Sequence, residues 1–242
     1  MEPQEMAQLK INPRSGFDRA IRDRDVAACL VKTAEIHGHY CPGSAFGVMA
    51  TLMGLEILGG NTSEGMEDLM AIVEINACFA DGVQAVSGCT LGNNALVFRD
   101  LGKMAVTLAR RDAQTGVRVK VRGQIRDHVD RLLPEFFPLM EKVIMARQGT
   151  LEDEKSFREK GRQAAFALIA HPFDTYFESQ TVQPVLPPYA PIVQSLVCPG
   201  CAETVLGTKT VREDEKKGFC RACAGTKVPA VDGRGIGREL LK

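Results

Sequence analysis

The chain has 242 residues, of which 45% are hydrophobic and 25% charged, and its 30 basic residues balance 30 acidic ones. This composition is typical of a folded globular protein, and the zero net charge gives no reason to expect a nucleic acid, a membrane surface or an acidic partner. The first ten residues contain no basic segment leading into an apolar stretch, so we expect no secretory signal and a cytoplasmic protein. Eight cysteines in such a chain indicate reduced thiols or metal ligands rather than disulfide bonds.

Two helices are predicted in the first quarter of the chain. Apolar spacing predicts one over residues 17–35, and a second, buried on most sides, over residues 44–58. No Asp, Glu, Lys or Arg occurs over residues 36–55, but two histidines, a proline and several glycines interrupt this stretch, so we expect no membrane span. The second helix is too apolar to face water, and this favours a homodimer.

Strands are predicted in the middle of the chain. Residues 69–78 are β-branched and apolar, which is typical of a central strand, and Asp81 can N-cap a short helix after it. Residues 95–108 predict two strands around a turn at residues 100–102. The segment V-R-V-K-V-R, residues 117–122, alternates strictly between valine and a basic residue, which predicts a half-buried antiparallel strand.

The last third of the chain divides into helices, a linker and a cysteine-rich segment. Amphipathic spacing predicts helices over residues 124–147, with two proline interruptions, and 151–170. Four prolines in residues 184–191 are typical of a stiff connector between domains. We therefore expect three parts: a core domain over residues 1–180, a linker over 181–191 and a zinc-binding domain over 192–242.

The cysteine-rich segment has the spacing of a zinc site. Its four cysteines follow the pattern C-x2-C-x18-C-x2-C and are Cys198, Cys201, Cys220 and Cys223. Four thiolates on two tight turns form a closed tetrahedral shell for structural Zn²⁺, which predicts a small zinc-ribbon-like or treble-clef-like domain. A thiol redox pair and an iron–sulfur cluster are the alternatives. A closed site is not catalytic, so this domain is expected to position a partner or subunit.

The segment H-G-H-Y-C-P-G, residues 37–43, contains two of the four histidines of the chain. If the segment is extended, its side chains alternate, and His37, His39 and Cys41 project to the same side. Cys41 would then lie at the start of the predicted helix 44–58, where the helix dipole favours a thiolate. Two imidazoles and a thiolate indicate a metal site.

Further candidates come from E-I-N-A-C-F-A-D and S-G-C-T-L-G-N-N, which contribute Cys78, Asp81 and Cys89. A buried cysteine often acts as a small hydrophobic residue, so Cys78 at a strand end is equally compatible with the core and with a site. Cys89 lies in a glycine-rich loop, where a functional role is favoured.

Together these blocks resemble the FmdE family, named for the E-type component of formylmethanofuran dehydrogenase. The resemblance rests on H-G-H-Y-C-P-G and on the later run E-I-N-A-C-F-A-D-G-V-Q-A-V-S-G-C-T-L-G-N-N-A-L-V-F-R-D-L-G-K-M-A. Gly82 and Ser87 depart from the usual pattern. The resemblance implies an α+β core with an antiparallel sheet and packed helices, usually dimeric, and often a C-terminal four-cysteine zinc finger.

For the site, the resemblance implies a metal or thiol centre at His37, His39, Cys41 and Cys78, with Cys89 nearby as a cofactor-binding residue. The metal would be a second ion, again zinc, and Cys41 and Cys78 are the candidate catalytic groups. It also implies kinship with an accessory subunit of the molybdenum or tungsten enzyme that reduces CO2 onto methanofuran, with dehydrogenase subunits as partners.

Two other functions are weighed against this one. Arg118, Lys120 and Arg122 suggest a module in which the zinc domain docks protein or nucleic acid, but aromatic residues are only 6% of the chain, which disfavours nucleic acid. The third function is metal-free thiol redox chemistry of Cys41 with Cys78 or Cys89.

Overall fold

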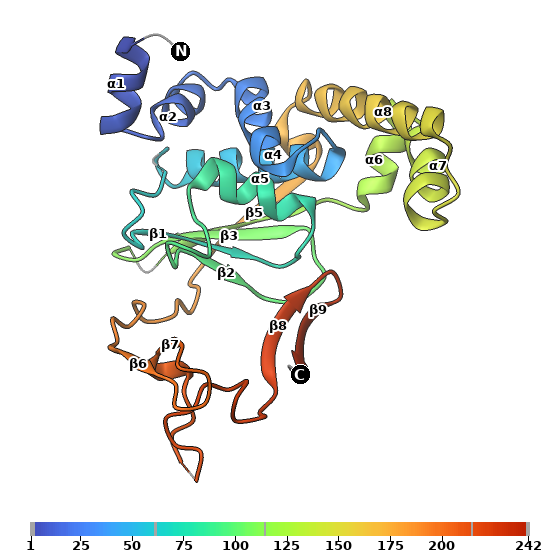
Figure 1. Cartoon of the computed structure of the whole chain (residues 1–242). Coiled ribbons are helices and arrows are strands. Elements are labelled where there is room, and N and C mark those ends of the chain that lie inside the picture. Colours follow the sequence, from blue (N-terminus) through green and yellow to red (C-terminus); the bar gives the residue numbers. More distant parts are fainter. Residues whose placement is uncertain (1–2, 61, 114, 214, 241–242) are drawn as a thin grey trace. The chain divides into compact units, whose positions relative to one another are not determined.

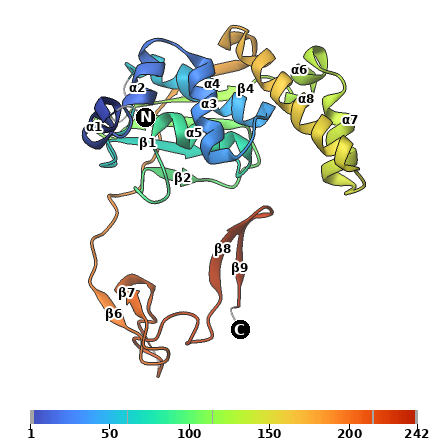
Figure 2. The same cartoon turned by 45° about the horizontal axis from the view of Figure 1, so that its top comes forward.

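A computed structural model of the chain describes residues 3–60, 62–113, 115–213 and 215–240. The chain forms two compact units, Met1–Leu186 and Pro187–Lys242 (Figures 1 and 2). The division falls within the proline-rich segment 181–191. Within the described ranges, no helix is both long and apolar enough to cross a bilayer.

The N-terminal unit contains a five-stranded sheet in the order β2-β1-β3-β4-β5. Neighbours pair antiparallel except β1 and β2, which are parallel. The expected α+β fold with an antiparallel sheet and packed helices is therefore confirmed. The strands are β1 Leu69–Val73, β2 Leu96–Phe98, β3 Ala105–Arg110, β4 Gly116–Val121 and β5 Phe177–Val182.

The segment 95–108 forms two strands, as predicted, but these strands do not pair with each other. β1 lies between them, because Val73 is opposite Phe98 on one side and Val106 on the other. The connection passes around the end of β1, where the amides of Leu101 and Lys103 both donate to the carbonyl of Glu74, at 3.3 and 3.1 Å. These hydrogen bonds satisfy a strand end that a tight hairpin would have left unpaired.

Helices α3, α4 and α5 cover one face of the sheet (Figure 1). α4 is buried over nearly its whole length, and it packs within its own chain against α3, α5, α8 and the sheet. The predicted buried helix is confirmed. The argument from it to a homodimer loses its basis, because the same chain covers its apolar surface. The helices are α1 Pro3–Ile11, α2 Ser15–Arg22, α3 Val26–His37, α4 Pro42–Ile57, α5 Cys78–Ser87, α6 Ile125–Leu132, α7 Phe136–Met140 and α8 Leu151–Ile169, with a π-helix η1, Glu141–Met145, after α7.

The single helix predicted over residues 17–35 is wrong, because the chain breaks between α2 and α3. Arg24 adopts a left-handed backbone with φ of 54°. Asp25 then caps α3 by accepting a hydrogen bond from the amide of Ala28 at 2.8 Å. The aspartate is an N-cap signal within an otherwise helical pattern.

Two glycines allow α4 and α5 to pack in backbone contact. A Cβ atom on Gly47 would lie 2.1 Å from the carbonyl oxygen of Phe79, and one on Gly82 would lie 2.6 Å from the carbonyl oxygen of Ser44. Any other residue at either position would force the helices apart. This contact brings the N-terminal ends of α4 and α5 together.

The C-terminal unit has little hydrophobic core. Its strands form two separate hairpins, and among its described residues only Cys198 is a buried hydrophobic side chain. Burial of apolar surface alone does not explain the folding of this unit, and a bound metal is the usual substitute. The hairpins are β6 Ser195–Val197 with β7 Thr204–Leu206, and β8 Val228–Asp232 with β9 Gly235–Glu239.

Candidate metal centres

Three helix ends meet in the N-terminal unit and bring together three metal-ligand side chains. His37 is the last residue of α3, Cys41 is the N-cap of α4, and Cys78 is the first residue of α5. One ligand atom of each lies within 4.8 Å of the others. We call these three residues the core cluster.

The core cluster arises from helix ends and not from the strand-like alternation predicted for residues 37–41. That prediction is wrong because α3 continues to His37 and is then terminated by Gly38, whose φ of 82° suits glycine. His39 is an exposed residue just beyond the helix end. Its ring lies against that of His37, with the ring centroids 4.3 Å apart, and its ring atoms are not among the tight group of ligand atoms.

Asp81 sets the orientation of the His37 ring. Nδ1 of His37 lies 2.7 Å from Oδ2 of Asp81, and because a carboxylate only accepts, Nδ1 carries the proton. Nε2 is then the nitrogen free to bind a metal, and it lies 3.5 Å from Sγ of Cys41. A histidine ligand held by a carboxylate in this way is the usual arrangement at zinc sites. Asp81 lies in the first turn of α5, so its predicted role as the N-cap is wrong; Ala77 occupies that position.

The two thiols of the core cluster hold one proton between them. The hydrogen bond from Cys78 is the main reason that the pKa of Cys41 is lowered far below its usual value, and hydrogen bonds from His37 and His39 add to it. The same bond to Cys41 raises the pKa of Cys78. The amide of Ser44 also donates to Cys41 Sγ, at 3.4 Å, as part of the N-cap of α4. Cys41 is thus a thiolate at a helix N-terminus.

The approach of the two cysteines depends on a third glycine. A Cβ atom on Gly43, in the first turn of α4, would lie 2.9 Å from Cβ of Cys78 and 3.8 Å from Sγ of Cys41. A larger residue at this position would therefore push the two ligand-bearing helix ends apart. The Pro-Gly pair after Cys41 supplies both the helix start and the space for Cys78.

The core cluster fits a zinc ion. Thiolate sulfur and imidazole nitrogen are the ligands that zinc binds most often, and the protonated Nδ1 of His37 leaves the correct nitrogen available. Three protein donors leave one position of a tetrahedral ion for a further ligand, which distinguishes this cluster from a closed structural site.

Cys89 lies apart from the core cluster. It is fully buried in the hydrophobic core, and its thiol donates a hydrogen bond to the carbonyl of Leu69 at 3.2 Å. Burial raises its pKa to about 12, so it is a thiol at neutral pH. These surroundings are those of a structural cysteine.

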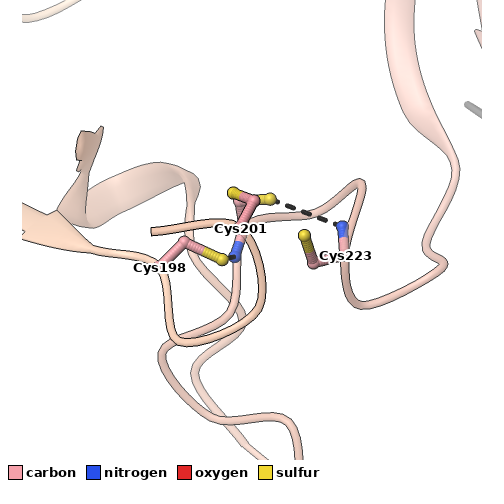
Figure 3. A group of neighbouring side chains, drawn as sticks. Cys198, Cys201 and Cys223 are labelled. Carbon is pink, nitrogen blue, oxygen red and sulfur yellow. Dashed lines mark hydrogen bonds between the residues drawn. The ribbon is translucent and has the colours of Figure 1, made fainter. Parts of the chain in front are cut away.

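The C-terminal unit contains the second cluster. The sulfur atoms of its four cysteines lie within 4.8 Å of one another, as the spacing predicts, and Figure 3 shows three of them, Cys198, Cys201 and Cys223. The amide of Cys220 donates to Sγ of Cys198 at 3.2 Å, and the amide of Cys223 donates to Sγ of Cys220 at 3.4 Å. The first of these bonds is the main reason that the pKa of Cys198 is lowered to about 6. Amide groups that point at the sulfurs favour thiolates and thus metal binding.

Comparison with known proteins identifies the family. Residues 36–178, more than half of the chain and the part that holds the core cluster, match the family described as "FmdE, Molybdenum formylmethanofuran dehydrogenase operon". The chain belongs to the FmdE family. The resemblance inferred from the sequence blocks is therefore confirmed.

Two similar proteins extend this result. The FmdE-family chain is 38% identical over 226 residues to a "Probable S-adenosyl-L-methionine-binding protein" of Archaeoglobus fulgidus; the match covers 91% of the chain but only 58% of that longer relative. It also resembles the crystal structure of a tungsten formylmethanofuran dehydrogenase FmdE-like protein from Syntrophus aciditrophicus, with a TM-score of 0.50 and 21% identity, over 83% of this chain and 92% of that one. At this identity the likeness shows a shared fold.

Sequence reasoning missed two features around the core cluster. Ser44 was not singled out, although a serine at the third helical position after Cys41 is the signal of a capping box, which the structure contains. Asp81 was a candidate, but its pairing with His37 could not be inferred, because the two residues are 44 positions apart.

Proposed function

We propose that this FmdE-family protein is a two-zinc accessory protein, with a reactive ion at His37, Cys41 and Cys78 and a structural ion at the four C-terminal cysteines. The observation that carries the proposal is the meeting of three ligand atoms within 4.8 Å at three helix ends, with Asp81 fixing the histidine tautomer. Zinc is the metal because the donors are sulfur and nitrogen.

The two ions would have different roles. The C-terminal site has four thiolates and is closed, so its ion would stabilise the fold of that unit. The core site has three donors, so its ion would keep a position for a water or substrate atom. In this proposal Cys41 and Cys78 are ligands and not nucleophiles, and the protein serves a dehydrogenase of the kind named for its family, as a subunit or partner.

Metal analysis tests the proposal. Purified protein is expected to contain about two zinc ions per chain, and Cys41→Ser and His37→Ala are each expected to reduce this to about one. Cys89→Ala is the matched control, because it removes a buried thiol outside the core cluster and should leave two. A content of one that neither cluster substitution changes would refute the core site.

The proximity of Cys41 and Cys78 favours a second candidate, a metal-free redox pair. Their sulfurs belong to the group within 4.8 Å, and one is a thiolate. Such a pair would oxidise to a disulfide after chelation, and Cys41 would react rapidly with iodoacetamide at neutral pH. Slow labelling in the chelated protein would exclude it.

We also propose a homodimer, on the basis of the family resemblance alone. Light scattering of the purified full chain would give twice the chain mass. A monomeric mass would remove this part of the proposal without affecting the two metal sites.

A further inference from the structure

A cavity of about 500 Å³ lies beside the core cluster, in the N-terminal unit. His37 and His39 form one wall, and the opposite wall comes from η1, the loop after it and the start of α8. This volume is in the range of pockets that hold small molecules. Its position matters because it shares His37 with the core cluster.

Two arginines give the cavity a positive lining. Arg147 and Arg158 both line it, and within the described ranges neither guanidinium forms an ion pair. The one carboxylate in the lining is that of Glu154, so the arginines outnumber the acids. Guanidinium groups bind carboxylates and phosphates through paired hydrogen bonds.

The backbone that holds Arg147 is unusual. The π-helix η1 ends just before it, with the amide of Ala146 donating to the carbonyl of Glu141 at 2.8 Å. Arg147 itself has φ of 54°, a left-handed conformation that costs free energy in a residue other than glycine. π-Helical turns and strained residues of this kind concentrate at functional sites. This is a second observation at the cavity, independent of the charges.

The rest of the lining is apolar. Val143, Ile144 and Phe157 contribute aliphatic and aromatic surface between the histidine wall and the arginines. A ligand that matches this lining has an anionic group at one end and an apolar body.

We propose that this cavity is the substrate site of the protein and binds a small organic anion, with Arg147 and Arg158 pairing with its anionic group. The inference rests on the proposed function, because the core ion beside His37 is what makes the cavity a reaction site. The anion is held next to the ion, and Glu154 limits affinity by repulsion.

Cobalt-substituted protein allows a test that separates the two proposals. Co²⁺ bound by Cys41 and Cys78 absorbs visible light, and the difference spectrum against Cys41→Ser isolates this ion from the C-terminal one. Absence of the core spectrum would refute the proposed function. With that spectrum present, benzoate is expected to shift it saturably, whereas its neutral isostere benzamide is not.

Variants then test the lining. Arg147→Gln and Arg158→Gln are each expected to weaken benzoate binding about five- to tenfold, as for a partly exposed charged hydrogen bond, with the ligand-free spectrum unchanged. Glu154→Gln should tighten binding. Lys155→Gln, which removes a positive charge from α8 outside the cavity lining, is the matched control and should have no effect. No spectral shift with benzoate, equal weakening by Lys155→Gln, or tighter binding of inorganic phosphate than of benzoate would overturn the proposal.

Discussion

Replacing Asp81 by asparagine tests how the core site holds its histidine. The substitution keeps an oxygen that can accept from Nδ1 of His37 but removes the negative charge that strengthens this 2.7 Å hydrogen bond. Loss of a carboxylate behind a histidine ligand typically weakens metal binding by about 10- to 100-fold. The Asp81 side chain is 37% exposed, so water compensates part of the loss. We therefore expect the weaker half of that range, about 10- to 30-fold, or about 1.4 to 2 kcal/mol.

Competition with a chromophoric zinc chelator measures this effect. The two sites release their ions separately, so the C-terminal cluster is an internal reference within each titration. Asp127→Asn is the matched control, because it removes a carboxylate from the first turn of another helix. If Asp81→Asn leaves the core affinity unchanged, Asp81 does not support the ligand. If both sites weaken equally, the effect is on the whole fold, and the reasoning also fails.

Three further predictions concern stability. Gly47→Ala should destabilise the N-terminal unit by about 3 kcal/mol or more in urea unfolding, whereas Gly92→Ala, where a Cβ atom has no neighbour closer than 3.9 Å, should change the free energy of unfolding little; equal effects would contradict the proposed helix contact. Glu74→Gln should cost about 2 to 3 kcal/mol, because this carboxylate is 6% exposed and holds its arginine partner through two bonds of 2.6 and 2.7 Å; the exposed Glu178→Gln should cost less than about 1 kcal/mol, and a reversed order would be inconsistent with this account. A strong chelator should make residues 187–242 exchange amide hydrogens freely while the sheet stays protected; protection that survives removal of the metal would show that this unit folds without it.

Local patterns were the most reliable part of the sequence reasoning. The four C-terminal cysteines lie on two short turns, so their spacing along the chain nearly fixes the positions of their sulfurs. The segment 117–122 became strand β4 because alternation of valine with charge admits one arrangement in a half-buried sheet. In contrast, the pairing of residues 95–108 with β1 depends on which strand is available as a neighbour, and this is not encoded locally.

The sequence by itself determined the family, the type of fold, the C-terminal cluster and the identity of His37, Cys41 and Cys78 as candidate ligands. Tertiary structure decided how these residues meet. Three helix ends, and not one extended segment, present them, and glycines 43, 47 and 82 allow α4 and α5 to approach closely enough. Tertiary structure alone also placed Arg147 and Arg158 beside the cluster. The reason is physical: a contact between residues far apart in sequence depends on how whole elements pack, and no local pattern records it.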